Sequence, residues 1–339
     1  LQKDVNFLQE AYSGSTSTAT PRYYAQFDED NFIVAPTPNS NYAIELHYYY
    51  RPTSLADSTI TINVASSNAL GIGEIITGAS SGIGKAMAYD LADRGAEVIL
   101  TARSLSQLEV LASQIKAKGG KAYVYPEDLA QPGSAKKLHF QIAEADLSVD
   151  LLINNAGYGR WGKFEDFTKD DYADMIQLNI TSLTDLCHLF MPAMANKGEG
   201  GVINIGSSAS FLPVPYASVY SSTKAYVLMF SEALRYEYAD RNIRIMASCP
   251  GATDSNFRNI ASEKSSERLK KRISKMKDEG HVGDSCDRVS KETLEAFLQI
   301  KHYVVPGKGN SKFAFLPRIL SRARVLKITG DTFKKHTAS

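Results

Sequence analysis

The stretch from residue 74 to residue 103 constrains the fold of this chain more than any other. It reads EIITGASSGIG, KAMAYDLADRG and AEVILTAR: an apolar run and a glycine-rich turn, then an amphipathic segment and a second apolar run. Later apolar runs lie in AYVYPEDL, VDLLINNAG, GVINIGSSAS and IRIMASCPG, and amphipathic segments lie at 106–118, 134–145, 170–196 and 220–240. Strands that alternate with helices predict a parallel sheet covered on both faces. We therefore expect a doubly wound α/β domain.

The first part of the chain has a different composition. Seven of the 18 tyrosines fall within the first fifty residues. RYYAQF and NFIVAP flank the turn-forming DED, and NYAIELHYYY follows with period-two alternation, so these stretches predict strands. TITINV predicts one further short strand in a region rich in Ser, Thr and Asn. We expect a β-rich segment over residues 1–58, a linker over 59–74, the α/β domain over 75–305 and a tail over 306–339.

Composition argues against several classes of function. The 339 residues carry a net charge of only +1, which gives no overall basic field for binding nucleic acid. Cys187, Cys249 and Cys286 are far apart and form no cluster with zinc spacing, so we expect no metal site and a reducing, cytoplasmic setting. There is no run of 18 apolar residues that would predict a membrane span.

The glycine-rich turn at 77–84 has the chemistry of a phosphate cradle. Gly78 permits the tight turn, Gly82 lets the backbone approach a pyrophosphate, and Gly84 lets helix and strand pack closely. The helix that follows offers free N–H groups and a partial positive charge to the phosphates. The second strand ends in Arg103 without a carboxylate, which favours the 2′-phosphate of NADP over the ribose hydroxyl of NAD. An ordinary solvated arginine is the alternative.

Four motifs, TGASSGIG, NNAG at 154–157, YSSTK at 220–224 and CPG at 249–251, occur in the order and spacing of the short-chain dehydrogenase/reductase family. Residues 75–305 resemble this family, which implies a Rossmann-type fold, a small carbonyl or alcohol substrate and a homo-oligomer, dimer or tetramer. In the family NNAG also steadies the central strand. The resemblance implies a nicotinamide dinucleotide that contacts Gly78, Ser80, Ser81, Gly82, Ile83, Gly84, Arg103, Asp128, Asn155, Ala156, Gly157, Tyr220, Lys224, Pro250, Gly251 and Ser255.

Tyr220 and Lys224 lie one helical turn apart, a spacing that by itself is typical of an ordinary surface helix, and the resemblance implies that they are a proton-transfer pair. A phenol near pKa 10 is a poor acid or base at neutral pH, and we expect the neighbouring ammonium to move its pKa toward ~7. The resemblance makes Tyr220 the proton donor and Lys224 a partner of the nicotinamide ribose. Ser207 matches the catalytic serine that binds the substrate oxygen, with Ser208 as the alternative. Asn179 matches the catalytic asparagine of a water-linked proton path to Lys224; a helix-kink residue bonded to backbone is the alternative.

The N-terminal segment resembles a different kind of protein. PRYYAQFDEDNFIVAPTPNSNYAIELHYYYRPTSL, within about residues 1–55, is similar to bacteriophage virion proteins of the neck or tail-adaptor kind. A central strand buried on both faces is expected to be apolar throughout, yet Gly73 and Glu74 stand where β-branched residues are expected. We expect the reductase sequence to begin near Ile75, joined to foreign sequence by natural fusion, engineering or gene assembly. A chain that begins near residue 71 and has Val in place of Gly73 and Glu74 is then expected to have a higher melting temperature.

The C-terminal part is rich in charge. Residues 256–284 stand where the family has its substrate lid, and their charge predicts an exposed amphipathic helix or a mobile segment. The tail over 306–339 has eight Lys and Arg against one acid, interleaved with apolar residues. Such a stretch makes peripheral contact with an anionic membrane or caps a subunit.

The motifs together predict NADPH-dependent reduction of a ketone or aldehyde, reversible as alcohol oxidation. The residues do not specify the substrate. A virion structural or adaptor protein whose reductase-like domain has incidental or lost activity is the alternative, and a non-catalytic nucleotide-binding sensor is a third.

Overall fold

The structure, a computed structural model, describes residues 73–265, 267–278 and 283–337, together with four short strands between residues 18 and 38. The chain divides into two compact units, Leu1–Ser67 and Asn68–Ser339, and each is described by itself.

The first unit contains short paired strands. β2 (Tyr23–Gln26) and β3 (Phe32–Ala35) pair antiparallel, and β1 (Thr18–Ala19) pairs parallel with β4 (Thr37–Pro38). The hairpin predicted on either side of DED is therefore confirmed. The strands predicted at 41–50 and in TITINV lie outside the described residues.

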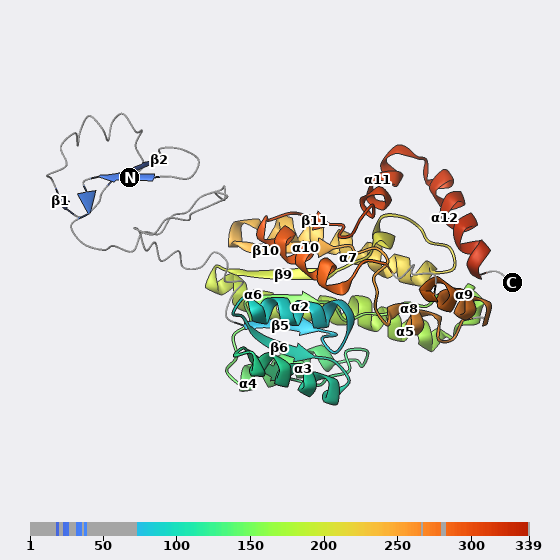
Figure 1. The fold of residues 1–339 in the computed structure, drawn as a ribbon, viewed down its shortest axis with the longest axis horizontal. Helices are drawn as coiled ribbons and strands as arrows, with labels where there is room; N and C mark the ends of the chain where they lie inside the picture. The colour runs from blue at the N-terminus through green and yellow to red at the C-terminus, as the bar shows by residue number, and fades with distance from the viewer. Residues whose placement is uncertain are drawn as a thin grey trace. The chain divides into compact units, whose positions relative to one another are not determined.

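The second unit is built on a seven-stranded, all-parallel sheet in the order β11-β10-β9-β8-β5-β6-β7 (Figure 1). The strands are β5 (Gly73–Thr77), β6 (Glu97–Thr101), β7 (Lys121–Val124), β8 (Leu151–Asn154), β9 (Gly200–Ile205), β10 (Ile243–Ser248) and β11 (Tyr303–Val304). The strand order reverses between β5 and β8, and doubly wound sheets bind ligands at the carboxyl ends of strands beside such a switch point. The predicted doubly wound, Rossmann-type domain is confirmed.

Helices cover both faces of this sheet. One face carries α2 (Gly82–Asp93), α3 (Leu105–Ala117) and α10 (Cys286–Leu298), and Figure 1 shows α2 and α10 side by side. The other face carries α4 (Ser134–Glu144), α6 (Ser182–Lys197) and α7 (Ser218–Glu237). Neighbouring strand residues point to opposite faces, so Ile75 packs in the α4–α6–α7 core and Ile76 in the α2–α3–α10 core. Burial of each such side chain contributes about 1.5–3 kcal/mol.

The remaining helices lie toward the carboxyl edge and the C-terminus. The segment expected as one helix at 170–196 is divided into α5 (Lys169–Ile176), the π-helix η2 (Gln177–Thr181) and α6. The short 3₁₀ turns are η1 (Phe164–Asp166), η3 (Ser208–Phe211) and η4 (Ala239–Arg241). The lid region forms α8 (Phe257–Ser262) and α9 (Glu267–Asp278), and the tail forms α11 (Ser311–Ile319) and α12 (Arg322–Thr337). In the described part of the chain, every helix is too short or too polar to cross a bilayer.

The central strand begins at Gly73, two residues before the start expected from the sequence. Asp150 N donates to Gly73 O at 2.7 Å, and Gly73 N donates to Asp150 Oδ2 at 3.4 Å. A Cβ at position 73 would lie 1.7 Å from the backbone oxygen of Ser148, so the neighbouring loop leaves no room for a side chain. The expectation of a β-branched residue at Gly73 is therefore wrong.

Glu74 places a carboxylate in the buried central strand, as the sequence indicated. It is fully buried, pairs with both neighbouring strands, and points to the same face as Ile76. Among the described residues neither of its carboxylate oxygens has a hydrogen-bond partner. Burial raises the pKa of Glu74 to about 9, while the charge of Arg94 opposes the rise and that of Asp150 adds to it.

Candidate active site

Helix α7 carries Tyr220 and Lys224 one turn apart, and both side chains are buried. Lys224 Nζ donates a 2.7 Å hydrogen bond to the carbonyl oxygen of Ile205, the last residue of β9. The pair is thus held at the carboxyl edge of the sheet, one strand away from β8.

A chain of buried amides and a hydroxyl fixes α7 to the two central strands. Asn154 Nδ2, at the end of β8, donates to Asn204 Oδ1 on β9 at 2.9 Å. Asn204 Nδ2 donates in turn to Ser231 Oγ on α7 at 3.0 Å. Buried hydrogen bonds hold their partners in a defined geometry, so this series of bonds fixes the position of α7 against the sheet.

Tyr220 is enclosed by aromatic and glycine residues. Its ring centroid lies 5.5 Å from that of Phe257 on α8, and a Cβ at Gly159 would come within 3.0 Å of the ring. Burial raises the pKa of Tyr220 to about 12, and a hydrogen bond with the Ser207 side chain opposes this rise. The expectation that Lys224 moves this pKa toward neutrality is wrong for the structure, because the ammonium is directed to Ile205.

Lys224 is itself perturbed. Burial lowers the pKa of Lys224 to about 8. A lysine with such a pKa gives up its proton far more readily than an exposed one, so both members of the pair are shifted toward their neutral forms.

The two candidate serines have different environments. Ser207 follows β9 and opposes the rise in the pKa of Tyr220, and its Oγ accepts a 3.1 Å hydrogen bond from Ala209 N at the start of η3. Ser208 uses its backbone N–H, which donates to Pro250 O at 2.8 Å. The structure therefore brings Ser207, the preferred candidate, to the phenol.

Asn179 lies in the π-helix η2 and is buried. Its Nδ2 donates to Tyr158 O at 2.9 Å and to Thr223 Oγ1 at 3.0 Å, while its Oδ1 accepts from Tyr158 N at 3.1 Å. A Cβ at Gly157 would lie 3.0 Å from Asn179 Oδ1 and 3.4 Å from Lys224 Nζ, which brings the amide close to the lysine. The backbone bonds and the π-helix match the kink alternative, and the closeness to Lys224 matches the expected site.

The glycine-rich turn between β5 and α2 fits a dinucleotide phosphate. Gly78 and Gly82 have φ of +66° and +58°, which side chains rarely adopt, and a Cβ at Gly84 would lie 2.5 Å from Gly78 O. Ser81 precedes α2 in extended conformation without a side-chain cap, and the first turn has no acid. The N-terminus of α2 therefore keeps its positive end without a protein anion, as a phosphate site requires.

The NNAG segment is bound to this turn through Thr77. Thr77 Oγ1 accepts from Asn155 N and Ala156 N, both at 2.9 Å, and Asn155 Nδ2 donates to Thr77 O at 2.9 Å. These bonds tie the ends of β5 and β8 together across the switch point. The predicted strand-steadying contacts of NNAG are thus present.

Other predicted cofactor residues lie around the same edge. Ser80 and Ile83 are half-buried in the turn, and Arg103 is exposed just after β6. Asp128 Oδ1 accepts from Ala130 N at 3.1 Å. Ser255 Cβ lies 3.4 Å from where a Cβ of Gly82 would stand, so the segment after Pro250 and Gly251 reaches the glycine-rich turn.

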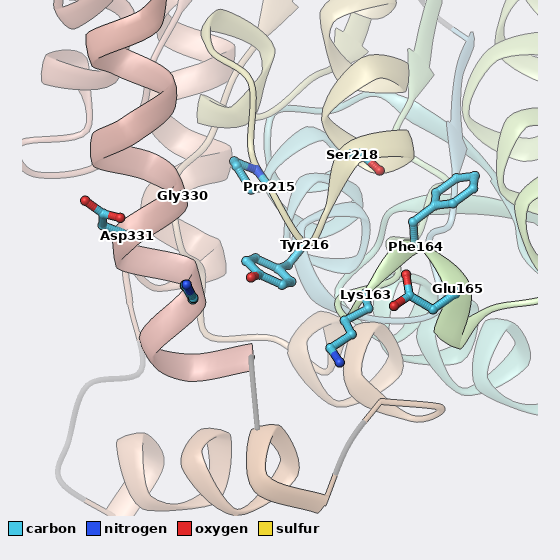
Figure 2. A pocket seen from close by; sticks show the side chains of 9 residues that line it. Lys163, Phe164, Glu165, Pro215, Tyr216, Ser218, Gly330 and Asp331 are labelled. Atoms are coloured by element: carbon cyan, nitrogen blue, oxygen red, sulfur yellow. The ribbon is translucent and has the colours of Figure 1, made fainter.

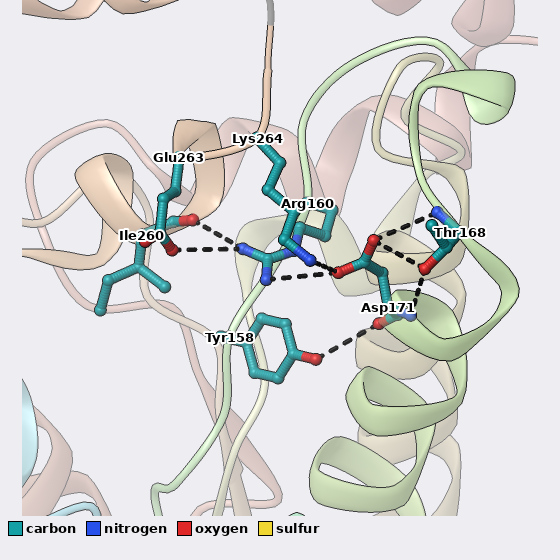
Figure 3. A network of polar contacts seen from close by, with 7 residues as sticks. All are labelled: Tyr158, Arg160, Thr168, Asp171, Ile260, Glu263 and Lys264. Carbon is teal, nitrogen blue, oxygen red and sulfur yellow. Dashed lines mark hydrogen bonds and ion pairs between the residues drawn. The ribbon is translucent and has the colours of Figure 1, made fainter.

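A polar network that the sequence did not predict joins the lid to the site (Figure 3). Arg160 lies 5.0 Å from the Tyr158 ring centroid, donates from Nη1 to Ile260 O at 2.9 Å, and has Nη2 3.8 Å from Asp171 Oδ1. Lys264 also donates to Asp171, which holds the pKa of that carboxyl below its usual range. The network fixes α8, whose Phe257 covers Tyr220. The only sequence signal is GYGRW directly after the asparagine motif.

The C-terminal helices also reach this region. Val325 of α12 is buried in the cluster that contains Tyr220, with Phe313, Leu316 and Leu320 packed against it. A cavity of about 540 Å³ opens beside it (Figure 2). It is lined by Lys163, Phe164, Glu165, Pro215, Tyr216, Ser218, Gly330, Asp331 and Lys334.

The sheet order and the glycine-rich first turn define a Rossmann-type α/β domain. A family model described as short chain dehydrogenase matches residues 74–266, more than half of the chain, and the chain therefore belongs to the short chain dehydrogenase family. A second family model, SU10 adaptor protein, matches residues 2–80. Both resemblances predicted from the sequence are confirmed, and the two matches overlap at residues 74–80.

Relatives of the second unit include oxidoreductases from distant organisms. Ketoacyl reductase HetN of Nostoc sp. is 34% identical over 52% of this chain and 62% of its own length. An uncharacterized oxidoreductase of Thermotoga maritima is 33% identical over 60% of this chain and 81% of its own length. Human 17-beta-hydroxysteroid dehydrogenase type 3 is 30% identical over 67% and 74%, respectively. The chain thus spans less than two thirds of HetN and more of the other two.

Solved structures give the same result. A short-chain dehydrogenase from Sphingobium yanoikuyae in complex with NADPH superposes with a TM-score of 0.59 at 28% identity, covering 77% of this chain and 93% of that one. The bulky-bulky ketone specific alcohol dehydrogenase from Comamonas testosteroni has a TM-score of 0.60 at 27% identity, covering 76% and 94%.

Proposed function

We propose that the second unit reduces a ketone or aldehyde with NADPH, and that Tyr220 donates the proton. The observation that carries this proposal is the buried pair Tyr220 and Lys224, one turn apart on α7, with Lys224 Nζ held by a hydrogen bond to Ile205 O. The site stands at the carboxyl edge of the sheet beside a turn that fits a dinucleotide phosphate.

The perturbed phenol suits a proton donor. With a pKa of about 12, Tyr220 is protonated at neutral pH and donates rather than accepts. A bound nicotinamide dinucleotide supplies the hydride to the carbonyl carbon. The oxygen then becomes an alkoxide, the conjugate base of an alcohol whose pKa is close to that of water and well above that of a phenol. Transfer of the phenol proton to it is downhill, which supports reduction as the direction at neutral pH.

The other residues hold the reacting groups in place. Ser207 hydrogen-bonds the carbonyl oxygen and stabilises the charge that develops on it. Lys224 would bond the nicotinamide ribose, and Asn179, which bonds the Tyr158 backbone and Thr223 of α7, would position the segment beside it. The phosphates would be held by the turn formed by Gly78, Ser80, Ser81, Gly82, Ile83 and Gly84, with Asp128, Asn155, Ala156, Gly157, Pro250, Gly251 and Ser255 completing the cofactor cleft.

We assign NADP rather than NAD for two reasons. Arg103 is an exposed cation at the end of β6, where the 2′-phosphate lies in Rossmann-type domains. The similar dehydrogenase from Sphingobium yanoikuyae is in complex with NADPH, and a similar metagenomic short-chain oxidoreductase, 26% identical, is in complex with NADP.

A second candidate function rests on the N-terminal match. The SU10 adaptor protein model matches residues 2–80, which supports a virion adaptor carrying a reductase-like domain with incidental or lost activity. The two hypotheses differ because only the enzymatic one requires the second unit to bind a dinucleotide and turn over a carbonyl substrate.

Fluorescence titration with NADPH and NADH, followed by turnover with a panel of aldehydes and ketones, tests the proposal. We expect tighter NADPH binding, turnover with at least one carbonyl, and a loss of about 10³-fold in the Tyr220→Phe variant with cofactor affinity unchanged. Tyr236→Phe, an 87% exposed tyrosine on the same helix, is the control and should behave as the parent. An active Tyr220→Phe variant would refute the assignment of the acid. A chain that binds neither cofactor supports the adaptor reading.

A further inference from the structure

The positive charge of this chain is concentrated in its last helices. Residues 306–339 contain eight Lys and Arg and one acid, whereas the whole chain has a net charge of +1. The remainder of the chain is therefore net negative. Among the described side chains, none of the cations on α11 and α12 forms an ion pair with a carboxylate.

Helix α11 combines these cations with large apolar side chains on its outer face. Phe315 and Ile319 are 58% and 62% exposed, although each is large enough to contribute to a core. Lys312 and Arg318 each stand three residues from Phe315, and at 100° per residue these two cations, Phe315 and Ile319 fall on about one third of the helix circumference. An apolar centre flanked by cations is the pattern of a helix that lies in a membrane interface.

The opposite face of the same helices is already occupied. Phe313 and Leu316 of α11 and Val325 of α12 pack into the cluster that contains Tyr220. Thr329 Oγ1 donates to Pro213 O at 3.0 Å, which fixes the middle of α12 to the loop before α7. Figure 1 shows α11 and α12 as two successive arms at the β11 end of the unit, with α12 returning toward α9. The outer face is therefore held in a set orientation.

Helix α12 continues the pattern along its flanks. Leu326 and Ile328 are 47% and 44% exposed, and Arg324 and Lys327 are exposed beside them. Asp331 is the single carboxylate of the tail. Four of the twelve large apolar residues that are exposed in the described part of the chain thus lie between 315 and 328.

We propose that the outer face of α11 and α12, centred on Phe315, Ile319, Lys312 and Arg318, binds to the surface of an anionic lipid membrane. Lipid phosphates match these cations, which form no ion pair among the described side chains although Arg318 Nη2 donates to Tyr303 OH at 3.3 Å, and the acyl boundary takes the apolar side chains. A second copy of the chain fits less well, because a two-fold contact would set the same cationic face against itself. Nucleic acid would pair with the cations but leave Phe315 and Ile319 against water.

Docking in this way sets the site close to the bilayer. The two faces of α11 are separated by one helix diameter, about 10–12 Å with side chains. The cluster around Tyr220 then lies at that depth above the lipid headgroups. An apolar substrate held in the membrane would have a short path to it.

Vesicle sedimentation with the full chain tests the proposal. We expect weak binding to phosphatidylcholine vesicles and strong binding when 30% phosphatidylserine is included, with the difference lost in 0.5 M salt. Each cation near an anionic surface contributes roughly a fivefold factor to partitioning. Lys312→Gln with Arg318→Gln should therefore weaken binding about 25-fold. Phe315→Ala with Ile319→Ala should weaken it at least tenfold on vesicles of either composition.

Lys136→Gln with Phe140→Ala on α4 is a matched control. Phe140 is 59% exposed and Lys136 is exposed one turn before it, so this variant removes one cation and one exposed apolar side chain, half of each α11 change, and binding should be unaffected. Equal binding to both vesicle compositions, or no effect of either α11 double variant, would overturn the proposal. It would also be overturned if those variants changed the oligomeric state measured by light scattering, because the face would then be a subunit interface. Tighter binding to a DNA duplex than to the anionic vesicles would assign the face to nucleic acid instead.

Discussion

Lys224 and Glu74 are both ionisable and both buried in the same α/β unit, yet their surroundings are opposite. Lys224 stands at the carboxyl edge of the sheet and donates to Ile205 O at 2.7 Å. Glu74 stands in the amino half of β5, and its carboxylate has no hydrogen-bond partner among the described residues. Burial moves the pKa of each toward the neutral form, to about 8 for Lys224 and about 9 for Glu74.

The difference shows that burial of a charge does not by itself mark a functional site. Around Lys224 the polar groups are ordered: its amine donates to Ile205 O, and Asn179 lies beside Gly157, whose other neighbour is the lysine amine. Around Glu74 the core is apolar, and the residue lies where the two family matches overlap. We propose that Lys224 serves the chemistry of the site, whereas Glu74 lowers stability without serving it.

The largest effect is expected at the lysine. Lys224→Met should lower turnover by about 10³-fold, within the range for loss of acid–base assistance. The free energy of unfolding should change by no more than about 1 kcal/mol, because loss of the bond to Ile205 O opposes removal of a buried ammonium. Steady-state kinetics and urea unfolding measure the two quantities. A variant that loses stability in proportion to activity would make Lys224 a structural residue.

The second effect is expected at Glu74, where substitution should change stability rather than turnover. Glu74→Val should raise the free energy of unfolding at pH 7 by roughly 3 kcal/mol, since a carboxyl with a pKa near 9 must be protonated on folding. Turnover should not change. Glu74→Gln is the control that removes the charge and keeps the polar group, and it should give part of the gain. If neither variant is more stable than the parent, the contrast with Lys224 fails.

The pH dependence of stability separates the two groups. The pKa of Glu74 rises from 4.5 to about 9 on folding, so its cost is absent below pH 4.5 and grows as the pH rises toward 9. The pKa of Lys224 falls from 10.5 to about 8, so its cost is full below pH 8 and is relieved toward pH 10.5. Glu74→Gln should therefore flatten the stability curve by about 1.4 kcal/mol per pH unit between pH 5 and 8. If the free energy of unfolding of the variant depends on pH as that of the parent does, Glu74 is not the group responsible.

The sequence was sufficient where local pattern and structure share a cause. Alternating strands and helices fix the doubly wound sheet, and the glycines of the first turn have the backbone angles that their role predicts. The Tyr–Lys spacing places both residues on one side of α7 because a helix has 3.6 residues per turn.

The rest depended on contacts between distant segments. Lys224 does not lower the pKa of Tyr220, because its ammonium donates its hydrogen bond to the carbonyl oxygen of Ile205, nineteen residues earlier in the chain. Arg160 reaches Ile260 across 100 residues, and the tail reaches the Tyr220 cluster from beyond the family match. Local periodicity carries no information about such pairs. The sequence made Gly73 look as irregular as Glu74 for the same reason. The backbone oxygen of Ser148, which leaves no room for a side chain at position 73, belongs to a distant segment.

Gly73 and Glu74 are adjacent, yet we expect substitutions at the two positions to change the free energy of unfolding in opposite directions. Gly73→Ala should lower the free energy of unfolding by about 2 kcal/mol, because a Cβ 1.7 Å from Ser148 O forces the backbone to shift. Gly330→Ala in α12 is the control, with only an ordinary 3.4 Å contact to Pro215, and should raise stability by about 0.5–1 kcal/mol. Thermal unfolding measures both. A Gly73→Ala variant as stable as the parent would show that β5 begins after residue 73.

The smallest effect is expected in the network that holds the lid. Arg160 contacts no reacting group, and it acts through α8, whose Phe257 covers Tyr220. Arg160→Met should raise KM about tenfold and lower kcat less than threefold, because substrate enclosure is weakened while Tyr220, Ser207 and Lys224 keep their bonds. Arg241→Met is the matched control: Arg241 also lies over a tyrosine ring, 5.9 Å from that of Tyr238, but it stands on η4 and makes none of the contacts that join Arg160 to Ile260 and Asp171. An effect on kcat alone would show that Arg160 reaches the chemistry directly, and an equal effect in both variants would show that loss of a cation on a tyrosine ring, rather than the lid network, is responsible.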